Sequence, residues 1–295
     1  MAFGYPKLLG DDRRCGGFKL VDDRKLNNGT KYMLPTDAGE INRLHLQHLV
    51  MRQLVHGNFN APIEELLEQG IKVLDVGCGN GAWTLEMAAD FPNSTFVGVD
   101  AALLFPSGSA ANVPFNCSFV KANTLKGLPF KDETFDFVFM RFMVFSFTPP
   151  DWIVTIRELT RLTRPGGWLE LFEHSIQLER PPPNIDIWKA VIDVSVAKGI
   201  DIKYVWELKS LLVANKFTRI ECDYISCPLG WGGRAGELHA QNCLMVYLAL
   251  QPLVSPRMNL TKEEFEEQAV KLVENYKEYK TWHKAPYVYG RKSLI

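Results

Sequence analysis

The chain has 295 residues, of which 46% are hydrophobic and 23% charged, a composition typical of a soluble globular protein and not of a disordered chain. Its 33 basic residues nearly balance 34 acidic ones, so we expect no nucleic-acid partner. No apolar stretch approaches the ~18 residues that a membrane-spanning helix needs, and the N-terminus lacks a basic segment followed by an apolar one. We therefore expect no membrane partner and no signal peptide, and we predict a cytoplasmic protein.

The cysteines and histidines do not show the spacing of a metal site. The six cysteines include no Cys-x-x-Cys pair and indicate no disulfide framework, so we expect free, buried thiols. His45 and His48 share one face of a predicted helix, but no third ligand follows at a suitable spacing. The sequence therefore predicts no metal site.

The N-terminal part of the chain divides into an arm and a helical cap. Residues 1–30 are rich in glycine and charged residues and are predicted to form a flexible arm. Apolar residues at helical spacing predict a helix over 38–56 that ends at Gly57. A second helix is expected between Pro62 and Gly70, which completes a cap over 31–70.

From Ile71 onward, apolar runs alternate with helical patterns. The predicted strands cover 71–76, 95–100, 118–123, 135–140, 168–173 and 217–225. Helices are expected over 82–91 and 149–162, the second with Asp151 as its N-cap. This alternation predicts an α/β fold with a parallel sheet that has helices on both faces.

The C-terminal part continues with helices predicted to about Lys198 and over 203–215. A glycine-rich loop at 228–233 precedes helices over 237–250 and 261–279, where Thr261 and Glu264 suit a capping box. The last segment, 281–291, alternates in polarity and contains Pro286, which favours an edge strand.

A glycine-rich loop after the first strand is the strongest functional signal. Gly77-Cys78-Gly79-Asn80-Gly81 would let a nucleotide-type ligand approach the backbone at the carboxyl edge of the sheet. Asp100 ends the second strand, where a carboxylate can bind ribose hydroxyls. Asp75 beside the loop suits the ammonium group of S-adenosylmethionine better than a pyrophosphate. The motif thus favours S-adenosylmethionine over NAD, and a nicotinamide dehydrogenase is the alternative enzyme.

The run from Val73 to Trp83 resembles motif I of the class I methyltransferases. The segments 122–130 and 135–141, and the turn 162–167 before the fifth strand, also resemble the corresponding segments of these enzymes. The resemblance implies a Rossmann-like, seven-stranded class I methyltransferase sheet with S-adenosyl-L-methionine as cofactor.

More specifically, the chain resembles small fungal methyltransferases that are distantly similar to regulators of secondary metabolism. The matching segments are 32–37, 43–48, 140–141, 230–233 and 289–292. This resemblance implies that residues 235–279 are a helical insertion or lid between strands 6 and 7. The methyltransferase core would then comprise 71–234 and 280–295.

The resemblance also implies a set of cofactor-binding residues. These are Tyr32, Gln47, Asp75, Gly77, Cys78, Gly79, Trp83, Asp100, Ala101, Asn123, Thr124 and Arg141. Three have structural alternatives: Trp83 could pack in the core, Asn123 could satisfy a local turn, and Arg141 could form a salt bridge at the sheet edge.

A small-molecule acceptor is expected near Phe142, Phe145, Trp231 and the helices of 235–279. Glu173 and His174 follow the fifth strand and are the candidate catalytic residues, as a general base for a hydroxyl acceptor. Their alternative is a polar strand end, or orientation of the acceptor without proton transfer.

These features predict an S-adenosylmethionine-dependent methyltransferase that acts on a small molecule. The alternative is a non-catalytic regulatory module that binds S-adenosylmethionine and acts through protein partners. An acceptor pocket beneath the helices of 235–279 favours the enzyme, whereas helices packed shut over the methyl group favour the regulator. A nucleic-acid methyltransferase is a weaker variant, because the net charge is not basic.

Overall fold

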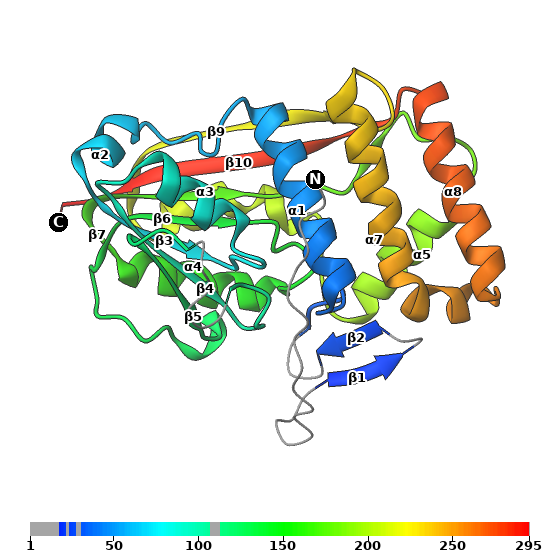
Figure 1. Ribbon diagram of the computed structural model, residues 1–295, viewed down its shortest axis with the longest axis horizontal. Coiled ribbons are helices and arrows are strands. Elements are labelled where there is room, and N and C mark those ends of the chain that lie inside the picture. Colours follow the sequence, from blue (N-terminus) through cyan, green and yellow to red (C-terminus); the bar gives the residue numbers. More distant parts are fainter. Residues whose placement is uncertain (1–17, 22–23, 28–30, 107–112, 295) are drawn as a thin grey trace.

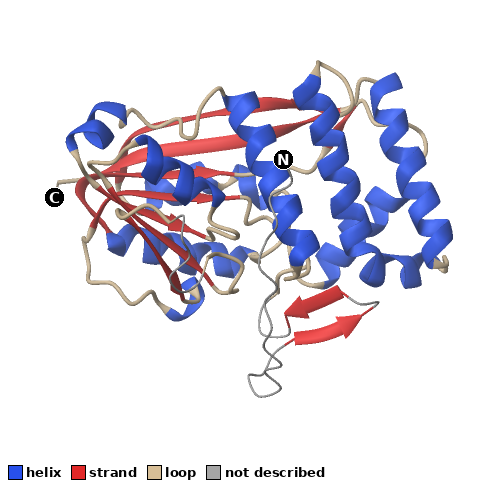
Figure 2. Ribbon diagram, viewed as in Figure 1, coloured by secondary structure: helices blue, strands red, loops and turns tan. Residues whose placement is uncertain are grey.

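The computed structural model describes residues 18–21, 24–27, 31–106 and 113–294 (Figure 1). The chain has an α/β fold in which helices cover both faces of a central sheet (Figure 2). A further group of helices lies toward one end of the sheet and comprises α1 (Ala38–Val55), α5 (Asp186–Ala197), α7 (Arg234–Met258) and α8 (Lys262–Glu278). Within this group, α7 contacts the other three helices.

The central sheet is mixed, with a parallel part and an antiparallel edge. Its parallel strands are β3 (Lys72–Val76), β4 (Thr95–Asp100), β5 (Cys117–Lys121), β6 (Phe135–Arg141) and β7 (Thr163–Phe172), in the spatial order β5-β4-β3-β6-β7. β10 (Trp282–Lys292) pairs antiparallel with β7, with β9 (Phe217–Pro228) and with the two-residue β8 (Leu178–Glu179). The sheet therefore has eight strands, one more than predicted, and β8 is the addition.

The prediction that residues 281–291 form an edge strand was wrong. β10 lies inside the sheet, between β7 and β8 on one side and β9 on the other. Pro286 fits there because its carbonyl oxygen accepts the backbone N–H of Glu173 at 2.8 Å, while the proline itself has no N–H to place. On this side of the sheet the edge strand is β9, most of whose residues are exposed.

Most of the helices from α1 to α6 lie close to their predicted bounds. The helices are α1 (Ala38–Val55), α2 (Glu64–Gln69), α3 (Ala82–Asp90), α4 (Pro149–Leu162), α5 (Asp186–Ala197) and α6 (Leu208–Ala214). Short 3₁₀ turns follow at 124–126 and 204–206, so part of the helix expected over 203–215 is a 3₁₀ turn.

Helix α4 begins one turn earlier than its predicted cap. Its N-cap is Thr148, and Asp151 occupies the third helical position, from which its carboxylate accepts the backbone N–H of Thr148 at 2.9 Å. Asp151 was therefore correctly placed at the start of the helix but wrongly assigned as the N-cap. The sequence Thr-Pro-Pro-Asp supports this arrangement, because proline is tolerated in the first helical turn.

Helices α7 (Arg234–Met258) and α8 (Lys262–Glu278) occupy the chain between β9 and β10, where the helical insertion was expected. Thr261 and Glu264 form the predicted capping box of α8. α7 is longer than predicted because it continues through Pro252 and Pro256. Buried Leu250 and Val254 in this last part belong to the main hydrophobic core, and their packing offsets the backbone hydrogen bonds that the prolines remove.

The predicted arm, residues 1–30, contains regular structure in the part that is described. β1 (Phe18–Val21) and β2 (Arg24–Asn27) pair antiparallel. The predicted flexibility of residues 1–17, 22–23 and 28–30 concerns positions outside the described residues.

The core lies on both faces of the sheet. Leu74, Val138 and Leu169 project into the larger cluster, whereas Val73 and Phe137 project into a second cluster with α2 and α3. Across the described residues, no helix is both long enough and apolar enough to span a membrane. The five cysteines in the described ranges are free thiols, and Cys222 is exposed.

A buried carboxylate joins the cap to the sheet. Glu170, in β7, is fully buried and accepts the backbone N–H groups of Asn60 and Ala61 and the side-chain amide of Asn60, at 2.8–3.0 Å. These residues precede α2. Burial raises the pKa of Glu170 to about 7, and the hydrogen bonds oppose this rise.

We predict that Glu170→Ala lowers the free energy of unfolding by about 2–4 kcal/mol, because it strands buried donors and leaves a cavity. Urea denaturation monitored by circular dichroism measures this change. Glu221→Ala is the control, since Glu221 is exposed on β9 and should change stability by less than about 0.5 kcal/mol. Equal effects of the two substitutions would show that Glu170 does not anchor the cap.

Candidate functional site

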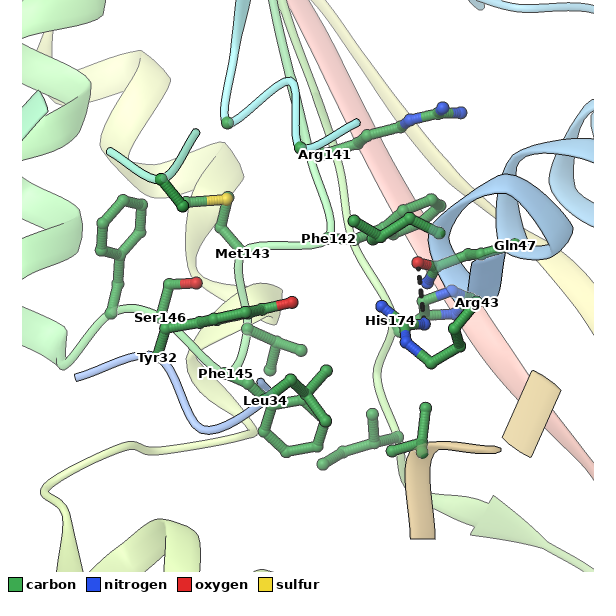
Figure 3. Close-up of a pocket in the computed structure, with 18 of the residues that line it drawn as sticks. Tyr32, Leu34, Arg43, Gln47, Arg141, Phe142, Met143, Phe145, Ser146 and His174 are labelled. Carbon is green, nitrogen blue, oxygen red and sulfur yellow. Dashed lines mark hydrogen bonds between the residues drawn. The ribbon is translucent and has the colours of Figure 1, made fainter. Parts of the chain in front are cut away.

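A cavity of about 550 Å³ lies at the carboxyl ends of the parallel strands (Figure 3). Residues from the loops after β3, β4, β5, β6 and β7 line it, together with residues of α1, α5 and α7. Ligands of open α/β sheets bind at this edge. The helical cap and the inserted helices therefore enclose a site that the parallel strands form.

The glycine-rich loop runs from β3 to α3 and forms one wall of the cavity. Gly77 and Gly79 have φ of 74° and 55°, in the left-handed region that favours glycine. A Cβ atom on Gly77 would lie 2.6 Å from Sδ of Met143, which no side chain could accept without movement. The backbone N–H groups of Gly77 and Cys78 donate to the carbonyl oxygen of Val99 and thereby hold the loop against β4.

Asp100 lies at the end of β4 and lines the cavity, as predicted from the sequence. Its Oδ2 accepts the backbone N–H of Gly79 at 2.9 Å, and its Oδ1 accepts that of Ala102 at 2.8 Å. Burial raises the pKa of Asp100, whereas these hydrogen bonds lower it. Each carboxylate oxygen has two lone pairs, so Asp100 can also accept hydroxyl groups of a ligand.

Two predicted binding residues lie away from the cavity surface. The carboxylate of Asp75 is buried beneath the loop, where it accepts the hydroxyl of Thr84 at 2.6 Å, and burial raises its pKa to about 6. The ring of Trp83 stacks on Phe139 with centroids 4.2 Å apart, so the core-packing alternative holds. Neither side chain lines the cavity, and the sequence could not distinguish a residue that supports the loop from one that faces a ligand.

The other predicted binding residues do line the cavity. They are Tyr32, Gln47, Gly77, Cys78, Gly79, Asp100, Ala101, Asn123, Thr124 and Arg141. Asn123 also satisfies a local turn, which was its predicted alternative role. Its Oδ1 accepts the backbone N–H of Leu125 at 2.9 Å and caps the following 3₁₀ turn.

Arg141 places a partly buried guanidinium at the end of β6. Its Nη2 contacts Nδ1 of His48 at 2.9 Å, and Nε2 of His48 lies 2.5 Å from the carboxylate of Glu86. Because arginine can only donate, Nε2 of His48 carries the proton and donates to Glu86. Burial lowers the pKa of Arg141 to about 10, so a ligand with an anionic group would be favourable here.

A polar network that the sequence did not reveal connects α1 with α7. Arg43 forms two hydrogen bonds with the carboxylate of Glu40, at 2.7 and 2.8 Å, and Tyr32 donates its hydroxyl to the same carboxylate. The Nη1 of Arg43 also donates to Gln47 at 3.2 Å (Figure 3). The same atom donates to Asn242 of α7 at 3.3 Å. The spacing of Glu40 and Arg43 on one helix was a visible signal, but the partner on α7 was not.

Glu173 was predicted as a general base, but it faces the backbone instead of the cavity. It is fully buried and accepts the backbone N–H groups of Met143 at 2.8 Å and Val144 at 3.0 Å. This carboxylate fixes the segment after β6, in which Phe142 has a left-handed φ of 59°. Glu173 is therefore a positioning residue.

His174 lines the cavity beside two histidines that the sequence analysis missed. It stacks on Phe142 with centroids 4.3 Å apart, and one ring nitrogen from each of His174, His239 (α7) and His283 (β10) lies within 4.8 Å of the others. The three histidines are far apart in sequence, so spacing gave no signal. Burial lowers the pKa of His174 well below its usual value, which makes it a weak base.

The end of the cavity near α7 is largely apolar. Phe142 and Phe145 line it as predicted, whereas Trp231 does not and instead donates its indole N–H to the carbonyl of Thr281 at 2.7 Å. Further apolar lining residues are Ile176, Trp188, Val191, Leu229, Val246 and Tyr247. Of the residues named for the acceptor, those of α7 therefore line the cavity and Trp231 does not.

Known proteins resemble this chain in sequence and in fold. A family described as "Methyltransferase domain" matches residues 73–167. Methyltransferase str3 of Strobilurus tenacellus is 34% identical over 203 residues, which cover 67% of this chain and 70% of that protein. The secondary metabolism regulator laeA of Aspergillus fumigatus is 30% identical over 145 residues, but these cover 48% of this chain and only 36% of the regulator.

A solved structure of Haemonchus contortus phosphoethanolamine N-methyltransferase 2, in complex with S-adenosyl-L-methionine, has a TM-score of 0.50. It is 13% identical and the match covers 84% of this chain and 57% of that chain, so this likeness concerns the fold alone. The predicted family is confirmed by the family match and by the extent of the likeness to the fungal methyltransferase. The chain belongs to the class I S-adenosylmethionine-dependent methyltransferases.

Proposed function

We propose that this protein transfers a methyl group from S-adenosylmethionine to a small-molecule acceptor bound in the apolar end of the cavity. One observation carries this proposal: a single cavity extends from the glycine-rich loop and Asp100 to the side chains of α7. Its volume of about 550 Å³ lies within the range of about 300–1,000 Å³ that is common for small-molecule sites.

The residues present fit S-adenosylmethionine as the donor. Asp100 can accept hydrogen bonds from ribose hydroxyls, and the glycine-rich loop allows close approach to the backbone. The partly buried guanidinium of Arg141 suits the carboxylate of the methionine part, because its one hydrogen-bonded partner among the described residues is the neutral ring of His48 and an arginine binds a carboxylate strongly. Asn123 and Thr124 would lie beside the adenine.

Bound S-adenosylmethionine supplies a methyl carbon on a positively charged sulfur, which is already activated for displacement. The residues of this chain therefore have to orient the two substrates and exclude water. Phe142 and Phe145 provide an aromatic wall, which favours a nearby cation as well as an apolar acceptor. The hydrogen bonds from Arg43 to Glu40 and Asn242 hold the cap and α7 together over the site.

The regulatory alternative is not favoured. It would be supported if α7 filled the space in front of the donor, but the cavity reaches Asn242, Val246 and Tyr247 on that helix. This space is lined mainly by apolar and aromatic side chains and by neutral imidazoles. We therefore expect an uncharged acceptor, of a size that the cavity can enclose.

Substitution of Asp100 tests the donor site. We expect Asp100→Asn to weaken binding of S-adenosylhomocysteine at least tenfold, or about 1.4 kcal/mol, because the amide loses the charge and half of the acceptor capacity. Isothermal titration calorimetry measures the affinity, with NADH as a ligand that should not bind.

Asp90→Asn is the matched control, because Asp90 is exposed at the end of α3 and does not line the cavity. Its affinity should equal that of the wild type. Unchanged affinity in Asp100→Asn would remove Asp100 from the donor site. A wild-type protein that binds neither S-adenosylhomocysteine nor S-adenosylmethionine would refute the proposed function.

A pH-dependent stability measurement tests the role of Glu173 in fixing the acceptor wall. Burial raises its pKa from 4.5 to about 8, so between these pH values the unfolded chain has released a proton that the folded chain retains. Raising the pH through this window therefore favours unfolding of the wild type, and Glu173→Gln lacks this contribution. We expect the stability of the wild type relative to Glu173→Gln to fall by more than about 1 kcal/mol from pH 5 to pH 9.

Urea denaturation at pH 5, 7 and 9 gives these differences. Glu221→Gln, at an exposed position, should differ from the wild type by a constant amount at all three pH values. A constant difference for Glu173→Gln as well would mean that the N–H groups of Met143 and Val144 keep the carboxylate ionised throughout.

A further inference from the structure

Three buried imidazoles converge at the end of the cavity that the acceptor would occupy. His174 follows β7, His239 lies in α7 and His283 lies in β10, and their exposed fractions are 7%, 3% and 6%. All three line the cavity. One ring nitrogen from each lies within 4.8 Å of the others, and the two Nε2 atoms of His239 and His283 are 3.1 Å apart.

This arrangement is close to that of three imidazoles around one metal ion. Zinc–nitrogen distances of about 2.0–2.1 Å and a tetrahedral angle place two ligating nitrogens about 3.3 Å apart, and the ring centroids about 5 Å apart. The centroid of His283 lies 4.8 Å from that of His239 and 4.9 Å from that of His174. The third pair, His174 and His239, is wider at 5.9 Å, so a shift of about 1 Å would complete the site.

The hydrogen bonds of the cluster are incomplete without a ligand. Nδ1 of His174 and Nδ1 of His283 are buried and have no hydrogen-bond partner within the described part of the chain. Such unpaired atoms are costly in a folded protein and are therefore uncommon. The unpaired Nδ1 of His174 is a second observation, independent of the ring geometry, that favours a bound group. The unpaired Nδ1 of His283 does not, because Nε2 is the atom of that ring that faces His239.

His239 has the orientation of a metal ligand. Its Nδ1 lies 3.2 Å from the carbonyl oxygen of Pro228, to which it can only donate, so in the neutral ring the lone pair is on Nε2 and points toward His283. Metal-bound histidines are commonly held in this way by a backbone carbonyl.

We propose that His174, His239 and His283 bind one divalent transition-metal ion of the zinc class, with a remaining coordination position open to the cavity. Three protein ligands with one open position are typical of catalytic zinc sites. Nitrogen ligands favour such an ion over magnesium or calcium, which prefer oxygen. The positive charge of nearby Arg43 is compensated by its two hydrogen bonds to Glu40.

The site also indicates the class of acceptor, and this step rests on the proposed function. A metal at the apolar end of the cavity would bind the oxygen of an alcohol or a phenol. The metal would lower the pKa of the bound O–H group, whose proton would pass to bulk solvent before the methyl transfer. The oxygen lone pair then forms the new bond to the methyl carbon, while the carbon–sulfur bond breaks and its electron pair stays on sulfur.

The test is a titration of the untagged, chelator-treated full chain with Co²⁺, whose ligand-field absorption in the visible range reports its coordination. We expect binding of one equivalent, displaced by Zn²⁺. His239→Ala and His283→Ala should each bind Co²⁺ at least tenfold more weakly. His45→Ala, which removes an exposed histidine of α1, is the matched control and should bind as the wild type does.

A wild-type protein without this absorption would overturn the proposal, whether or not the variants fold. Unchanged Co²⁺ affinity in both variants would overturn it as well, and would leave the imidazoles as direct hydrogen-bond partners of the acceptor. Calorimetry with S-adenosylhomocysteine on the metal-free protein separates the two proposals. If the protein binds S-adenosylhomocysteine but not Co²⁺, the metal site alone is rejected. If it binds Co²⁺ but not S-adenosylhomocysteine, the proposed methyl transfer is rejected.

Discussion

The cavity depends on one buried carboxylate that holds two backbone N–H groups. Glu173 binds Met143 and Val144 and so fixes the segment that leaves β6. That segment places Phe142 on the acceptor side and presses Met143 against Gly77 of the glycine-rich loop. The glycine-rich loop and the Phe142 side of the cavity therefore meet at residues that Glu173 positions. A substitution of Glu173 would alter both of these walls.

The remaining walls come from segments outside the parallel sheet, and buried polar groups hold them in place. Arg43 connects α1 with α7, while Glu170 connects β7 with the residues before α2. A buried charge without a partner would lower the free energy of unfolding by several kcal/mol. Arg43 and Glu170 avoid this cost, because each side chain forms several hydrogen bonds. The same requirement for complete pairing makes the unpaired Nδ1 of His174 informative.

Local patterns were sufficient to predict the parallel strands, the glycine-rich loop and Asp100, because apolar runs and turn residues determine these over a few neighbours. They were insufficient wherever the answer depended on a distant partner. Trp83 and Asp75 have the residue types of a binding site, but their neighbours Phe139 and Thr84 place them in the core. Pro286 indicated an edge strand, although β9 covers that side of β10. The histidine cluster combines three distant segments, so no spacing could reveal it.

The environment of His174 decides between two roles that its residue type allows. A general base works best with a pKa near the working pH, whereas burial lowers the pKa of this ring and disfavours its protonated form. A metal ligand requires the opposite, a neutral ring with its lone pair available. Two further neutral imidazoles within 4.8 Å satisfy the same requirement and would add nothing to a single base. The convergence of three ring nitrogens is therefore the observation that favours the proposed metal site over a single general base.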